Sequence, residues 1–121
     1  MGCPVMQWQI VSIDPERLAA FYSTLFGWKI NADNPLKYRV ADTGAGRGIN
    51  GGFWPAPPEA HGFTQLFIEV EDIDAMVRRA GELGAEVLIP PQSLPDGSKL
   101  SILRDPMGVP FGVYVGPGRQ A

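Results

Sequence analysis

Hydrophobic and polar residues alternate along two stretches of the chain, residues 5–12 (VMQWQIVS) and 63–70 (FTQLFIEV). This alternation predicts β-strands, because successive side chains of a strand point to opposite faces. The apolar faces, each suited to being covered by a helix, are formed by Met6, Trp8 and Ile10 and by Leu66, Ile68 and Val70. The opposite faces are more polar and consist of Gln7, Gln9 and Val11 and of Gln65, Phe67 and Glu69.

A helical pattern follows each of these strands. Asp14 and Asp72 are candidate N-caps, Pro15 suits the first position of a helix, and Gly27 and Gly84 mark the predicted ends. Apolar residues at helical spacing then predict the buried faces, formed by Leu18, Phe21, Tyr22 and Leu25 in the first helix and by Ile73, Met76, Val77 and Ala80 in the second.

The order of elements repeats along the chain. Shorter strands are predicted after the first helix at residues 28–30, 38–41 and 48–54, and after the second at 86–88, 99–104 and 111–115. The spacing from Gln7 to Asp14 is the same as that from Gln65 to Asp72. We therefore predict an α+β fold with two βαβββ modules, at 1–56 and 62–117, joined by the proline-rich hinge WPAPPEAHG within one domain, 1–121.

Composition narrows the functional classes. The chain has 121 residues, a net charge of -3 and a single cysteine, Cys3. No basic stripe is present, so we expect no nucleic-acid partner. One cysteine excludes an intramolecular disulfide, and no stretch reaches the roughly 18 apolar residues of a membrane span. We expect a cytoplasmic protein without a membrane partner.

Three segments of the sequence resemble the vicinal oxygen chelate superfamily, the group of glyoxalase I, extradiol dioxygenases and the fosfomycin- and bleomycin-resistance proteins. These segments are IDPERLAAFYSTLFGWKI, FIEVEDIDAMVRRAGELGAEVLIPP and LRDPMGVPFGVY. The resemblance covers essentially the whole chain and implies curved mixed sheets that enclose a cavity. It also implies a homodimer, because small members of the group usually pair.

The resemblance further implies where a metal would bind. Metal-dependent members carry His or Gln on the first strand of each module and Glu on the fourth. The corresponding residues here are Gln7 and Gln65, then Gly52, or its neighbour Gly51, and Gly112. Neutral amides and glycines leave the charge of a divalent ion almost uncompensated, so we expect no metal at this site and no cofactor.

Without a metal, the same positions suggest a site for an organic ligand. Gly52 and Gly112 would leave space, while Trp54 and Tyr114, each two residues further along the strand, would provide stacking walls. Gln7 and Gln65 would supply hydrogen bonds, or would instead form a polar pair that only seals the sheet contact. The cations Arg39 and Lys99 would meet an anionic group if they lie on the same side.

The preferred interpretation is a protein that binds a small organic molecule without the family metal, as bleomycin-resistance proteins do. The main alternative is a metal-dependent lyase, isomerase or dioxygenase of the glyoxalase type, and a second is a non-catalytic interaction module. Glu69 is the candidate catalytic residue, with solvation or pairing to an arginine as the alternative. His61 in the hinge is predicted to be a solvated loop residue, with a role as a ligand or proton carrier as the alternative. The sequence leaves the ligand and any reaction open.

Overall fold

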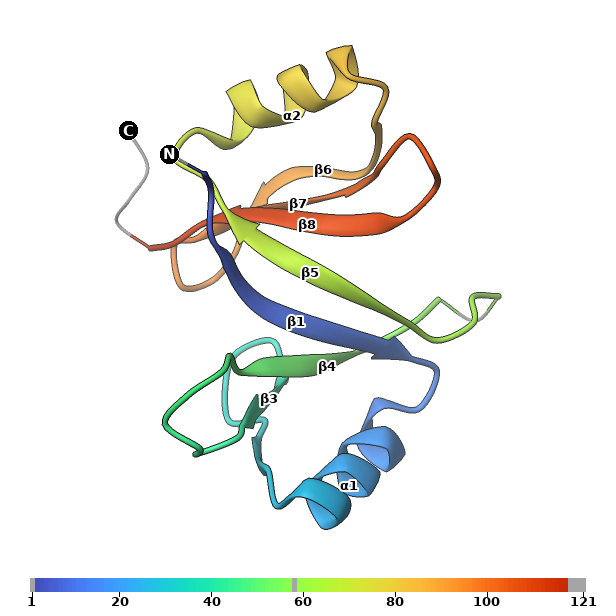
Figure 1. Cartoon of the computed structure of the whole chain (residues 1–121), viewed down its shortest axis with the longest axis vertical. Coiled ribbons are helices and arrows are strands. Elements are labelled where there is room, and N and C mark those ends of the chain that lie inside the picture. The colour runs from blue at the N-terminus through green and yellow to red at the C-terminus, as the bar shows by residue number, and fades with distance from the viewer. Residues whose placement is uncertain (1, 58, 118–121) are drawn as a thin grey trace. The chain divides into compact units, whose positions relative to one another are not determined.

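The computed structural model describes residues 2–57 and 59–117 and confirms the α+β fold with two successive βαβββ motifs (Figure 1). The elements are β1 (Val5–Ser12), α1 (Pro15–Phe26), β2 (Lys29–Asn31), β3 (Arg39–Asp42), β4 (Gly51–Pro55), β5 (Phe63–Glu69), α2 (Ile73–Glu82), β6 (Glu86–Ser93), β7 (Lys99–Arg104) and β8 (Pro110–Val115).

The helices begin at the residues that the sequence predicts. The Asp14 carboxylate accepts a hydrogen bond from the Arg17 backbone N–H at 3.0 Å, and the Asp72 carboxylate accepts one from the Ala75 N–H at 3.1 Å. Each bond satisfies an amide that a helix N-terminus leaves without an intrahelical partner. Gly27 ends α1 in the left-handed conformation, with a φ of 75°, which glycine adopts without steric cost.

Two compact units can be described, one formed by residues 7–65 and the other by residues 2–6 together with 66–117. They divide within β1 and β5. In the first unit the strand order is β2-β3-β4-β1, with β1 parallel to β4 and the other pairs antiparallel. In the second the order is β5-β8-β7-β6, with β5 parallel to β8. The two motifs thus share one strand pattern.

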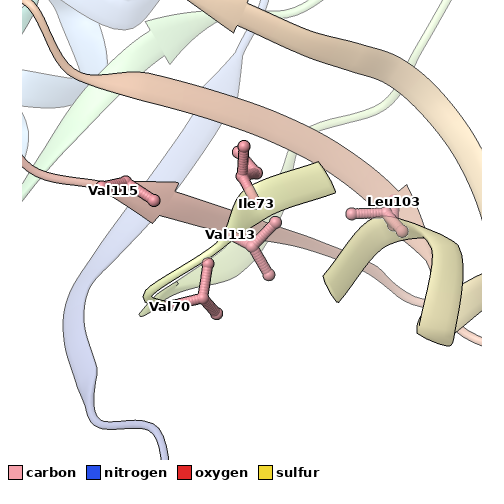
Figure 2. Packing of buried hydrophobic residues seen from close by; sticks show 5 residues of the cluster. All are labelled: Val70, Ile73, Leu103, Val113 and Val115. Carbon is pink, nitrogen blue, oxygen red and sulfur yellow. The ribbon is translucent and has the colours of Figure 1, made fainter. Parts of the chain in front are cut away.

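The core of the second unit lies between α2 and the strands β6, β7 and β8. Figure 2 shows its buried residues, Val70, Ile73, Leu103, Val113 and Val115. The predicted stripe of α2 is confirmed, because Met76, Val77 and Ala80 pack against this cluster. Leu66 differs from the prediction: it is 45% exposed. The alternation predicts on which face of the strand Leu66 lies. Its side chain would be buried only if another element packed against that position.

The core of the first unit is built from Ala19, Ala41 and Phe53, with Trp8, Ile10, Leu18 and Tyr22 among the side chains packed around them. The predicted face of α1 is only partly right, since Phe21 is 57% and Leu25 59% exposed. The small Ala19 is buried against the sheet and shifts the packing face of the helix toward Ala19 and Tyr22. Phe21 and Leu25 fall outside that face.

Strand β6 is longer than the sequence pattern predicts and runs through two prolines. It is the outermost strand in the order of its unit, so only one of its edges pairs with another strand of that unit. A proline, which has no N–H to donate, is tolerated in such an edge strand. The pairing with β7 shifts register between Val87 and Ile89 and again between Ile89 and Gln92. The shifts accommodate Pro90 and Pro91, whose lack of an N–H would otherwise break a regular ladder.

Candidate functional site

A chain of three polar side chains lies within the first unit. The Gln65 amide Nε2 donates a hydrogen bond to Gln9 Oε1 at 2.6 Å, and Gln9 Nε2 donates to the Tyr38 hydroxyl at 3.4 Å. Gln65 and Gln9 are only 6% and 8% exposed. Among the described residues nothing donates to Gln65 Oε1, which is itself buried. Burying an acceptor without a hydrogen-bond partner costs free energy. The hydrogen-bond network is therefore incomplete at Gln65 Oε1.

Two neighbouring glycines in β4 make room for aromatic rings on opposite faces of the sheet. A side chain at Gly51 would overlap the Trp8 indole, which belongs to the core under α1. A side chain at Gly52 would overlap the Tyr38 phenol on the other face. Gly52 therefore leaves the space that the sequence predicted, but the Tyr38 ring occupies this space.

The face that carries Tyr38 is turned away from α1. Strand pairing places Val40 and Gln9 beside Gly52, so all three share this face. Trp54 also lies on it, with its ring centre 5.8 Å from that of Tyr38. A partly open depression continues over β2 and β3 and is lined by Lys29, Asn31, Asp33, Asn34, Val40 and Asp42.

The loop before β3 holds the backbone of Tyr38 firmly. The Asn34 side chain donates to the Tyr38 carbonyl at 2.7 Å and accepts from the Tyr38 N–H at 2.9 Å. Lys37, between them, is the one non-glycine residue in the described part of the chain with a positive φ, at 56°, a conformation that costs a non-glycine residue energy. Burial raises the pKa of the Tyr38 hydroxyl, although the hydrogen bond with Gln9 opposes this effect.

The predicted site residues are distributed over both units. Gln65, Trp54 and Gly52 come together around Tyr38 in the first unit, where Gln7 is half-buried two positions before Gln9. The sequence placed Gln9 on the polar face of its strand with Gln7 but did not name Gln9 or Tyr38 among the ligand-binding residues. The position of Tyr38 depends on hydrogen bonds from the Asn34 side chain, which no pattern in the sequence predicts.

The other predicted residues lie in the second unit. The Phe67 ring takes the space in which a side chain at Gly112 would lie, so this glycine does not leave an empty space either. Glu69 pairs with Tyr114 across β5 and β8, which places them side by side, both half-buried. The assignment of ligand contact to Gly112 and Tyr114 and of catalysis to Glu69 stays a prediction.

The two cations considered for an anionic ligand lie on the helix-covered faces instead. Arg39 pairs with the core residue Phe53 across β3 and β4, and its guanidinium lies 3.9 Å from the carboxylate of Glu16 in α1. Lys99 pairs with Val115, a residue of the core under α2. His61 is exposed, as predicted for a loop residue.

The residues present do not fit the metal site of metal-dependent relatives. Within residues 2–57 and 59–117, no three His, Cys, Asp or Glu side chains come together to hold an ion. Rings occupy the volume at Gly52 and Gly112, the positions at which the family resemblance implies carboxylates. Amides alone are poor ligands for a divalent cation. In the same part of the chain, neither helix is long and apolar enough to cross a membrane.

Comparison with solved structures shows the fold. A methylmalonyl-CoA epimerase in complex with methylmalonyl-CoA and NH4+ matches with a TM-score of 0.65 and 18% identity, over 98% of each chain. The Mycobacterium tuberculosis methylmalonyl-CoA epimerase matches with a TM-score of 0.65 and 17% identity, over 93% of this chain and 87% of that one. At this level of identity the likeness concerns the fold alone.

Comparison of sequences shows the family. "Putative glyoxylase CFP32" of Mycobacterium bovis is 31% identical, over 84% of this chain and 41% of that protein, and the protein of the same name in Mycobacterium tuberculosis matches equally. The chain thus spans about two fifths of the length of these relatives. The model of the glyoxalase-like domain matches residues 9–114. The chain belongs to the glyoxalase-like domain family, within the vicinal oxygen chelate superfamily that its sequence resembles.

Proposed function

We propose that the chain binds a small organic molecule on the face of the first unit that carries Gln9, Gln65, Tyr38 and Trp54, without the metal of metal-dependent relatives. The observation that carries this proposal is the buried Gln65 Oε1, which lacks a hydrogen-bond partner among the described residues. The network that ends at this atom lies on the same sheet face as an aromatic pair. Apolar walls with a few convergent polar groups are typical of small-molecule sites.

The solved relatives support an organic ligand in this family. The structures of methylmalonyl-CoA epimerase hold methylmalonyl-CoA or 2-nitronate-propionyl-CoA. Thioesters and related carbonyl compounds are therefore the first class to test, both for binding and for turnover. Turnover that required an added divalent metal would favour the alternative, a metal-dependent lyase, isomerase or dioxygenase, over metal-free binding.

A thermal-shift screen tests the proposal. A ligand that binds the folded chain raises its melting temperature, by mass action. We expect acyl-CoA thioesters and small aromatic carbonyl compounds to include at least one that stabilises the wild type but not the Gln65→Leu variant. The matched control is Gln92→Leu, the same change at an exposed position in β6. If no compound separates the wild type from Gln65→Leu, the non-catalytic interaction module becomes the better interpretation.

We also propose that the chain forms a homodimer. Val87, Leu88 and Ile89 are each about two fifths exposed on β6, the outermost strand of its unit. An edge strand with consecutive exposed apolar residues is a natural surface for association. Light scattering after size-exclusion chromatography should give twice the chain mass of 13.1 kDa, and Leu88→Lys should reduce it to the mass of one chain.

A further inference from the structure

We propose that the Tyr38 hydroxyl is the hydrogen-bond donor that selects the ligand, so that the ligand carries a carbonyl or carboxylate oxygen as the acceptor. This inference rests on the proposed function, because it assigns ligand chemistry to the same site. It concerns a residue that neither the repeat nor the family positions single out. Four separate contacts of Tyr38 support it.

The backbone of Tyr38 is fixed from one side chain. Asn34 bonds both the N–H and the carbonyl of Tyr38 through its amide, at 2.9 and 2.7 Å. The Asn34 carbonyl also accepts a bond from the Lys37 N–H at 3.0 Å, which closes the turn around the strained residue. Strained backbone persists where surrounding contacts over-determine it, and it is common at functional sites. Asn34 is therefore a positioning residue for Tyr38.

The side chain of Tyr38 is fixed as well. Its ring lies where Gly52 has no side chain, and Trp54 packs beside it. The Gln9 amide donates to the phenol oxygen, and its direction is set by the 2.6 Å bond that Gln9 Oε1 accepts from Gln65. A hydroxyl has one proton to donate besides its acceptor lone pairs. Since Gln9 donates to the phenol oxygen, the Tyr38 proton remains for an acceptor other than Gln9.

The donor is neutral at physiological pH. A tyrosine hydroxyl with the ordinary pKa of 10.0 already keeps its proton at neutral pH, and burial raises the pKa of Tyr38 further. A neutral donor in a partly buried site forms a hydrogen bond to an acceptor oxygen of the ligand. When an apolar analogue binds instead, the donor loses its water without gaining a hydrogen bond, which costs free energy. A site built to hydrogen-bond an oxygen therefore discriminates against an isostere that lacks it.

The test uses two probes of similar shape, acetophenone and α-methylstyrene. In α-methylstyrene a methylene group replaces the carbonyl oxygen of acetophenone. Titration of 15N-labelled protein is followed through the side-chain amide signals of Gln9 and Gln65 and the indole signal of Trp54. We expect Tyr38→Phe to weaken acetophenone binding about tenfold, the equivalent of ~1.4 kcal/mol, and to leave α-methylstyrene unchanged. Tyr22→Phe, the same change in the core under α1, should match the wild type for both probes.

The positioning role of Asn34 is tested by a double-mutant cycle. Asn34→Ala should weaken acetophenone binding, and adding it to Tyr38→Phe should cause no further loss. If Asn34 had a purely structural role, Asn34→Ala would instead weaken the binding of both probes, in the wild type as well as in Tyr38→Phe.

The possible results separate the two proposals. Equal acetophenone affinity in the wild type and Tyr38→Phe would overturn the assignment of Tyr38 while leaving ligand binding at this face intact. Additive effects of the Asn34 and Tyr38 substitutions would overturn the positioning role. If neither probe moves the three reporter signals, this inference is contradicted. The proposed site is contradicted as well only if the acyl-CoA thioesters of the thermal-shift screen also fail to separate the wild type from Gln65→Leu.

Discussion

The phenol ring of Tyr38 occupies the space where any side chain at Gly52 would lie. The family resemblance implies that metal-dependent enzymes carry an acidic metal ligand at this glycine or at its neighbour Gly51. The Tyr38 hydroxyl in this volume accepts a hydrogen bond from Gln9. On the prediction from the resemblance, a neutral hydroxyl group would therefore lie where related enzymes have a carboxylate that binds a cation.

Gly52→Ala should destabilise the fold by about 1–3 kcal/mol, because the added methyl group overlaps the Tyr38 ring and forces both to shift. The free energy of unfolding is measured by urea denaturation. The cost should fall in a Tyr38→Ala background, where the ring is absent. Gly81→Ala is the control, because a side chain at this α2 position meets nothing within 4 Å and alanine favours a helix. Equal costs of Gly52→Ala in both backgrounds would contradict the proposed overlap.

Gln9→Leu should cost more stability than Gln65→Leu. Among the described residues, the Gln9 side chain makes two hydrogen bonds to other side chains and Gln65 makes one. Removing Gln9 therefore leaves both ends of the buried Gln65 amide without a partner in this part of the chain. We expect a loss of about 1–3 kcal/mol for Gln9→Leu. Gln65→Leu removes Gln65 Oε1, a buried oxygen with no partner within residues 2–57 and 59–117, which offsets part of the cost of the substitution. A larger loss for Gln65→Leu would show that its oxygen is satisfied in solution.

Stability should fall at alkaline pH in a way that depends on Tyr38. Its pKa is raised in the folded chain above the ordinary value of 10.0. Above pH 10 the unfolded chain therefore loses this proton before the folded chain does, so unfolding becomes more favourable as the pH rises. Unfolding free energies measured from pH 8 to pH 11 should decline less steeply for Tyr38→Phe than for the wild type. Identical slopes would mean that Tyr38 titrates as an exposed tyrosine.

Metal binding should be weak. Protein purified without a chelator and offered nickel, zinc, manganese or ferrous iron should carry well below one metal ion per chain, with an unchanged melting temperature. The reason is the donor set, two amides with rings in place of the carboxylates. Stoichiometric metal by elemental analysis would contradict this prediction and make glyoxalase and dioxygenase assays the next step.

Local patterns in the sequence were sufficient for the order of elements. The capping aspartates, the proline at the start of α1 and the period-two alternation act over a few residues, so Asp14, Asp72 and the bounds of β1 and β7 follow from the chain alone. Repetition of these patterns then predicts two βαβββ motifs. The family resemblance added the fold group, which the glyoxalase-like domain match confirms.

Burial and the site depended on contacts between residues distant in sequence. Leu66 and Phe21 have the expected periodicity but remain exposed, because periodicity assigns a face and only packing covers it. The glycines at 52 and 112 indicated missing side chains, yet which rings fill the space was decided by the register of neighbouring strands and by the turn that Asn34 holds. The sequence by itself thus determined the order of the elements and the family. The tertiary structure joined Gln65, Gln9 and Tyr38, since a hydrogen bond between side chains forms only once folding has brought them within reach.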